Sequence, residues 1–112
     1  MKALVLLAAL FLLTGAARVV DPYGNTVTVY ETPCVSAKVI AQIPRFNALL
    51  AQVGGRPRTA DSFMAADLVF EGKQYAACWT VVGADVVVID DSGQDTSIFG
   101  VPMQYFVDVP KL

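Results

Sequence analysis

The sequence predicts an α+β fold, in which a small antiparallel β-meander packs on a kinked helix or helix pair and is braced by one disulfide. Three observations lead to this prediction. Short alternating or β-branched runs recur along the chain, apolar residues recur every three or four positions between 35 and 53, and the 112 residues include two cysteines. One domain is expected at this length, because domains usually run about 100–150 residues.

The N-terminal segment has the three parts of a secretory signal peptide. A positive start at Met1-Lys2 precedes an unbroken apolar run from Ala3 to Leu13, and small residues from Thr14 to Ala17 suit a signal peptidase. A retained membrane anchor is the less favoured alternative, because the run is shorter than the ~20 residues that span a bilayer. We expect a signal peptide at 1–17 and one mature domain at 18–112, periplasmic or secreted, with no membrane span after cleavage.

Cysteine use agrees with export. Cys34 and Cys78 form an even pair, which in a small exported domain is typical of a structural disulfide. A redox-active or nucleophilic cysteine is the less favoured alternative, because no second cysteine lies nearby in the sequence and the chain has no histidine.

In the first half of the chain, the pattern changes from strand to helix. Residues 18–25 are expected as a polar lead-in with a turn at 21–25, and the alternating run 26–30 predicts a strand that Thr32-Pro33 stops. A helical stripe follows, with Ser36 as its cap, a break at Pro44 and an end at Gly54-Gly55. The apolar positions of this stripe are Val35, Val39, Ile43, Phe46, Leu49 or Leu50, and Val53.

In the second half, the period returns to two. Strands are expected at 66–70, 74–82 and 85–90, separated by turns at 71–73 and 83–84, with a polar turn at 91–94 and shorter strands near 96–99 and 105–109. In the longest strand, Tyr75 and Trp79 share one face, while Cys78 and Val82 share the other and face the helix. Tyr75 and Trp79 are binding candidates if their face is open; burial under the C-terminal segment is the favoured alternative.

Several stretches resemble a group of small, uncharacterised exported proteins of Gram-negative bacteria and their phages. The matching pieces cover most of the mature chain: Thr32-Pro33-Cys34, Gly72 to Trp79, Val86 to Asp91 with Gly93, and Val101-Pro102 followed by Phe106. The most specific piece is the Tyr-x-Ala-Cys-Trp core at 75–79. The chain departs from the group where Ser92 separates Asp91 from Gly93, and in its long Gly-Arg-Pro loop. The resemblance implies a shared disulfide-braced domain; it carries no activity and no site residues.

Acidic residues gather around Gly93. Asp90, Asp91 and Asp95 offer the oxygen ligands that calcium prefers, but their spacing misses the alternating Asp-x-Asp-x-Asp-Gly loop. A hydrolase with paired carboxylates is also disfavoured, because neighbouring residues of a strand point to opposite faces. We expect a solvated turn, with no metal site and no catalytic residue.

Basic residues gather in the loop at 54–62. Arg56 and Arg58, with Arg45 as a further member, present guanidinium groups that grip carboxylate or phosphate groups bidentately. Ordinary solvated arginines are the favoured alternative. The candidate binding residues are therefore Arg56, Arg58, Tyr75 and Trp79.

Composition narrows the function classes. The absence of histidine excludes a Ser-His or Cys-His pair and most zinc sites, and a net charge of −2 gives no basic footprint for nucleic acid. We expect no cofactor and no enzyme activity. The favoured hypothesis is an exported binding or accessory protein that contacts an envelope protein, for example as an inhibitor of a cell-wall enzyme. The alternatives are a structural or envelope-stress protein without a dedicated ligand and, less favoured, a small hydrolase. The oligomeric state stays open.

Overall fold

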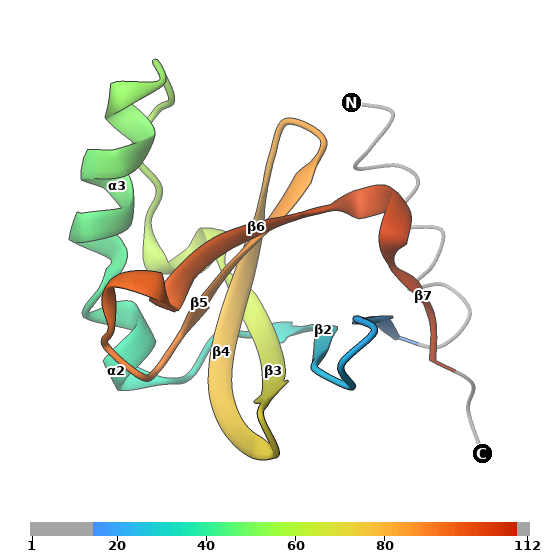
Figure 1. Ribbon diagram of the computed structural model, residues 1–112. Coiled ribbons are helices and arrows are strands. Elements are labelled where there is room, and N and C mark those ends of the chain that lie inside the picture. Colours follow the sequence, from blue (N-terminus) through green and yellow to red (C-terminus); the bar gives the residue numbers. More distant parts are fainter. Residues whose placement is uncertain (1–14, 110–112) are drawn as a thin grey trace.

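The computed structural model describes residues 15–109, and its main feature is a curled antiparallel sheet of seven strands (Figure 1). The strand order is β6-β5-β4-β3-β2-β1-β7, so every neighbour in the sheet from β1 to β6 is also a neighbour in the chain. The strands are β1 (Ala16–Val20), β2 (Thr26–Pro33), β3 (Met64–Phe70), β4 (Lys73–Val82), β5 (Asp85–Asp90), β6 (Ile98–Pro102) and β7 (Val107–Asp108). The predicted α+β meander is confirmed.

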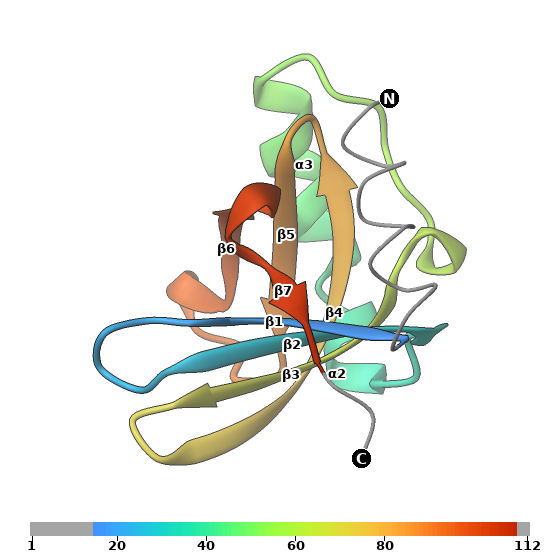
Figure 2. The ribbon, with the colours of Figure 1, turned by 90° about the vertical axis from the view of Figure 1, so that its right-hand side faces the viewer.

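The last strand extends the sheet beyond β1. After β6, the short 3₁₀ helix η3 (Met103–Tyr105) carries the chain across to β1, where β7 pairs antiparallel with Arg18 opposite Val107 (Figure 2). The backbone N–H of Val109 donates to the carbonyl of Ala16 at 3.2 Å. The crossing curls the sheet and leaves a concave inner face.

Two short helices cover part of the outer face. α2 (Ala37–Ile40) and α3 (Ile43–Gln52) are separated at 41–42, and Pro44 lies in the first turn of α3, where its missing N–H costs nothing. The predicted break is thus confirmed. The Ser36 hydroxyl accepts from the backbone N–H of Val39 at 3.4 Å, as its expected capping role requires.

The helix ends at the glycine pair. Gly54 adopts a φ of +80°, and the N–H of Gly55 donates to the carbonyl of Leu50 at 3.0 Å, which is a Schellman-type ending. The chain then reaches β3 through a loop that contains the 3₁₀ helix η1 (Ala60–Ser62).

Each face of the sheet carries its own core. The outer core lies under the helices and includes Val39, Ile43, Phe46, Leu50, Phe63, Cys78 and Ile89. The inner core lines the concave face and includes Val27, Val29, Leu68, Trp79, Val86, Val88, Met103 and Phe106. Because β5 contributes to both cores, its four consecutive apolar residues are covered on both sides, as the sequence predicts.

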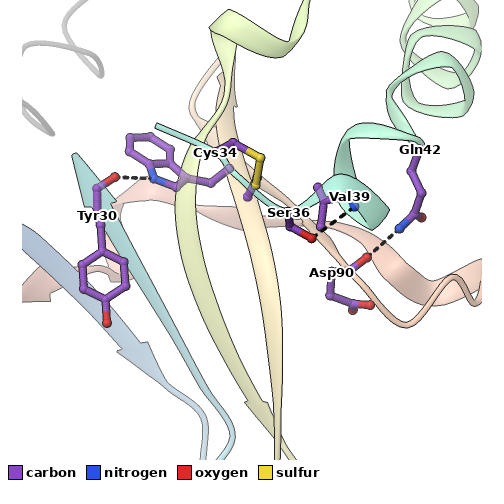
Figure 3. Close-up of a disulfide and its surroundings, with 8 residues drawn as sticks. Tyr30, Cys34, Ser36, Val39, Gln42 and Asp90 are labelled. Carbon is purple, nitrogen blue, oxygen red and sulfur yellow. Dashed lines mark hydrogen bonds between the residues drawn. A yellow bond between two sulfur atoms is a disulfide. The ribbon is translucent and has the colours of Figure 1, made fainter. Parts of the chain in front are cut away.

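The disulfide crosses the outer core. Cys34, just before α2, bonds to Cys78 in the middle of β4 across a sequence separation of 44 residues (Figure 3). Gln42, at the junction of the helices, donates to the backbone carbonyl of Asp90 at 2.7 Å and accepts from the Ser97 hydroxyl. These two links hold the helix pair to β4 and β5.

Four details differ from the sequence prediction. Residues 16–20, expected as the end of the leader and a polar lead-in, form β1. Strand β2 continues through Thr32-Pro33 with an irregular register, and β6 begins at Ile98 rather than near 96. The ends of the apolar stripe, Val35 and Val53, are 83% and 79% exposed. The expected signal peptide lies mainly outside the described residues. Over residues 15–109, no helix is long and apolar enough to cross a membrane.

Candidate functional site

A groove of about 1000 Å³ opens on the concave face of the sheet. One wall is formed by the ends of the β1–β2 and β3–β4 hairpins, and the opposite wall by β6, η3 and the segment that follows β5. Its volume is at the upper end of the roughly 300–1,000 Å³ that ligand pockets occupy. The groove exists because the curled sheet brings these distant segments to face one another (Figure 2).

The floor of the groove is apolar and continuous with the inner core. Val27, Leu68 and Tyr75 line it from the hairpins, and Phe99 and Val101 line it from β6. These side chains share one face because alternate residues of a strand point to the same side. At the margins, Phe70 is 46% exposed and Tyr105 is 57% exposed. The groove therefore leaves large apolar side chains available for contact.

The charged residues that line the groove are mainly acidic. Asp21, Glu71 and one basic residue, Lys73, are exposed at the hairpin ends that form its rim, and Asp90 lines it from a buried position. The Asn25 side chain donates to Asp21 at 2.8 Å, and the backbone N–H groups of Asn25 and Tyr23 also donate to this carboxylate. These hydrogen bonds hold the pKa of Asp21 below its ordinary value, so the group stays negative through the neutral range.

Of the two aromatic binding candidates, only Tyr75 lines the groove. Tyr75 is half-buried and lines the groove, whereas Trp79 is 5% exposed and belongs to the core beside Met103 and Phe106. The indole N–H of Trp79 donates to the backbone carbonyl of Tyr30 at 2.9 Å (Figure 3). Trp79 is therefore buried together with residues of the C-terminal segment, as the favoured alternative predicted, and it contributes to packing.

The three arginine candidates do not line the groove, and their side chains have different surroundings. The Arg58 guanidinium donates to the Thr80 hydroxyl at 3.1 Å and to the Val81 carbonyl at 3.0 Å. Arg56 is exposed. Arg45 donates to the backbone carbonyl of Gln94 at 3.2 Å. Arg58 is thus bound to the sheet, whereas Arg56 is exposed.

In the acidic turn, Asp90 has a defined structural contact. Asp90 is 6% exposed, and its Oδ1 accepts from the backbone N–H of Ser92 at 2.9 Å, which organises the turn after β5. Among the residues that the structure describes, no group of three or more His, Cys, Asp or Glu side chains is placed to hold a metal ion. The Ser92 N–H thus engages one of the two carboxylate oxygens of Asp90.

Comparisons with protein-family models, with curated proteins and with solved structures find no match to this chain. The geometry of the groove and the chemistry of its lining are therefore the observations that bear on function.

Sequence reasoning missed most of the groove. Phe70, Phe99 and Tyr105 read as ordinary strand or loop residues, because their proximity depends on how far the sheet curls. One signal was available for Phe99 and Val101: their alternation around Gly100 marks one face of a strand. Tyr75 is the one member of the predicted set that lines the groove.

Proposed function

We propose that this chain is an exported, non-enzymatic binding protein of the bacterial envelope that acts through a protein contact in its concave groove. The observation that carries the proposal is the groove itself, which combines an apolar floor with a mainly acidic rim. Apolar side chains supply the area that a partner buries, and rim charges select the partner and speed its approach.

The groove is rigid, so a partner can bind with little loss of conformational entropy in this protein. Its floor lies on a hydrogen-bonded sheet, and the disulfide and the inner core hold that sheet in one shape. A preformed surface loses little conformational freedom when a partner binds. Inhibition of a cell-wall enzyme such as lysozyme is one specific form of this role, because an inhibitor needs a rigid surface and no chemistry of its own.

The test is capture of the partner by the groove. The full chain, with a C-terminal tag, is expressed from its own leader in its bacterial host, crosslinked, and analysed by mass spectrometry. Phe70→Glu places a charge in the groove, and Val53→Glu places the same charge on an exposed residue at the end of α3, outside the groove. We expect one stoichiometric partner with the wild type and with Val53→Glu, and its loss with Phe70→Glu.

Two results would contradict the proposal. A partner retained by Phe70→Glu would place the contact elsewhere, and the lack of any enriched partner would favour a structural protein without a ligand. The same purified chains, added in excess to lysozyme, test the inhibitor form: full lysozyme activity excludes it. The acidic turn supplies no specific observation in favour of a hydrolase, so that alternative is not developed.

A further inference from the structure

The first strand of the sheet begins inside the segment that the sequence pattern assigns to the leader. β1 starts at Ala16, and the next residue, Ala17, is fully buried in the inner core. Ala17 pairs with Val29 of β2 on one side and with Asp108 of β7 on the other. Cleavage before Arg18 would therefore remove a core residue at which three strands meet.

Two bonds in this stretch suit a signal peptidase. The enzyme requires small residues at the third and at the first position before the bond that it cleaves. In the run Thr14-Gly15-Ala16-Ala17, this requirement is met for cleavage after Ala16 and for cleavage after Ala17. Cleavage after Gly15 would place a leucine at the third position, where a small residue is needed. Of the two suitable bonds, the first leaves Ala17 in the core.

The residue opposite Ala17 has an unused hydrogen-bond acceptor. The Oδ1 atom of Asp108 is buried and has no hydrogen-bond partner among the residues that the structure describes. A buried acceptor without a partner lowers stability, and the loss is larger for a charged group. The carboxylate of Asp108 therefore lies in a position where a nearby donor would stabilise the fold.

The register places the backbone of Ala17 beside this carboxylate. The N–H of Val109 donates to the carbonyl of Ala16, so Ala17 and Asp108 form the non-hydrogen-bonded pair that follows in the ladder. In such a pair, the Cα atoms lie about 4.5 Å apart and the two side chains are on the same face. The nitrogen of Ala17 is about 1.5 Å from its Cα, and it is thus a near neighbour of the Asp108 side chain.

We propose that the leader is removed at the bond between Ala16 and Ala17, and that the new α-ammonium group of Ala17 forms an ion pair with the carboxylate of Asp108. The cleaved bond lies one residue earlier than the bond before Arg18 that the sequence pattern predicts. The step is a hydrolysis: the oxygen of water bonds to the carbonyl carbon of Ala16, the C–N bond breaks, and the nitrogen of Ala17 gains the protons. Ala16 leaves with a carboxylate, and Ala17 starts the mature chain.

The ion pair replaces a contact that the cleavage removes. In the full chain, the N–H of Val109 donates to the carbonyl of Ala16 at 3.2 Å, and this carbonyl leaves with the leader. The pair between Ala17 and Asp108 then holds β7 to β1 at the same point (Figure 2). Because β7 follows η3, whose Tyr105 lines the groove, this link also fixes one wall of the groove. The inference rests on the export named in the proposed function, and it is independent of the groove contact.

The first test measures where the leader is removed. The full chain with a C-terminal tag is expressed from its own leader, and the exported protein is analysed by intact mass spectrometry. We expect a chain that begins at Ala17, which is heavier by one alanine residue than a chain that begins at Arg18. A start at Arg18 or at any other residue would overturn this inference alone. A chain that keeps its leader would also overturn the export on which the proposed function relies.

Two substitutions distinguish the two bonds without changing the mature chain. Thr14→Lys places a large, charged residue at the third position before the proposed bond, and Gly15→Lys does the same for the alternative bond. We expect Gly15→Lys to give the same start at Ala17 as the wild type, and Thr14→Lys to lose it. The reverse pattern would show that the enzyme cleaves before Arg18.

The second test measures the ion pair in the mature chain. Asp108→Asn keeps the size of the side chain and removes its charge, and acetylation of Ala17, introduced by semisynthesis, removes the charge of the ammonium group. Each change should raise the unfolding equilibrium constant in urea about tenfold, the order expected for a charged hydrogen-bonded pair that loses one partner. The two changes together should raise it no more than either one alone, because both remove the same contact.

An exposed aspartate gives the matched control. Asp61→Asn, in η1, makes the same chemical change at a position on the surface, and it should have little effect with either form of the N-terminus. Additive effects of Asp108→Asn and acetylation would show that the two groups do not interact, and would overturn the ion pair even if the mature chain begins at Ala17.

Discussion

Arg58 holds the loop between α3 and β3 against the sheet. Its side chain donates to Thr80 and to the carbonyl of Val81, while its backbone N–H and carbonyl pair with the side chain of Asn47 at 2.8 and 2.9 Å. The same residue type two positions earlier, Arg56, is exposed. The pair thus offers a direct comparison of a bound guanidinium with a solvated one.

Arg58→Ala should lower the free energy of unfolding by about 1–3 kcal/mol, because it removes charge-assisted hydrogen bonds to the Thr80 hydroxyl and the Val81 carbonyl. Arg56→Ala should leave stability within about 0.5 kcal/mol of the wild type, as is usual for surface substitutions. Urea unfolding of both variants measures the difference. Equal midpoints for the two would show that the Arg58 contacts add nothing to stability.

Tyr30 makes the stability of the fold depend on pH in the alkaline range. Burial, and then the hydrogen bond that its hydroxyl donates to Asp67 at 2.9 Å, raise the pKa of Tyr30 above its ordinary value. The folded protein therefore holds this proton more tightly than the unfolded chain. The associated stability is present below the unfolded pKa of about 10 and is lost as pH rises through the folded pKa.

Tyr30→Phe keeps the ring and removes the hydroxyl. The wild type should be more stable than this variant at neutral pH, and the gap should close as pH rises above about 10. Chemical unfolding of both chains at a series of pH values gives the gap directly. A gap that stays constant with pH would show that Tyr30 does not carry the effect.

At the level of elements, the end of α3 depends on a close approach of the backbone. A Cβ built on Gly55 would lie 2.4 Å from the Cγ of Leu50, a buried residue of the outer core. A larger residue here must displace Leu50 or open the helix ending.

Gly55→Ala should therefore destabilise the fold by about 1–3 kcal/mol, the usual effect of overpacking. Gly100→Ala has room for its methyl group and should be close to neutral. Differential scanning calorimetry of the two variants tests the contrast, and a neutral Gly55→Ala would mean that Leu50 moves aside at no cost.

The elements that follow local rules were predictable from the sequence. The alternation in β4, the continuous apolar run of β5, the cap at Ser36 and the break before Pro44 depend on residues close in the chain. The placement of Val35 and Val53 on the buried face of the helix was wrong, because apolar periodicity does not show where a neighbouring surface ends.

Strand β1 and the groove depend on contacts distant in the sequence. Ala16 and Ala17 have the small side chains that a leader ending also has, and their pairing with β2 and β7 is with residues distant in the sequence. Likewise, Phe70 and Tyr105 become neighbours of one groove through the curl of the sheet. Local patterns carry no information on that curl.

For the whole molecule, the disulfide is the largest single constraint on the unfolded chain. It closes a loop across 44 residues, and a loop of this size contributes roughly 4 kcal/mol in the chain-entropy model. A small domain has about 5–15 kcal/mol in total. The bond also lies within the outer core, so its loss affects the packing of α2 on β4.

Cys34→Ala combined with Cys78→Ala should lower the thermal unfolding midpoint by many degrees, since 1 kcal/mol shifts a domain of this size by about 4–8 °C. Reduction of the wild-type chain should give a similar shift. Unchanged melting curves for the reduced chain and the double variant would show that the bond does not stabilise the fold.

The antiparallel pair β1–β7 places residues 16 and 109 beside each other, with a hydrogen bond between their backbones. Segments far apart in the sequence thus meet at one point of the surface. A circularly permuted chain, with a short linker from Val109 to Ala16 and new termini between the exposed Arg56 and Pro57, keeps every strand and the disulfide. The groove of such a chain would be unchanged, so the seven-stranded sheet serves as a scaffold whose termini can be relocated without altering the groove.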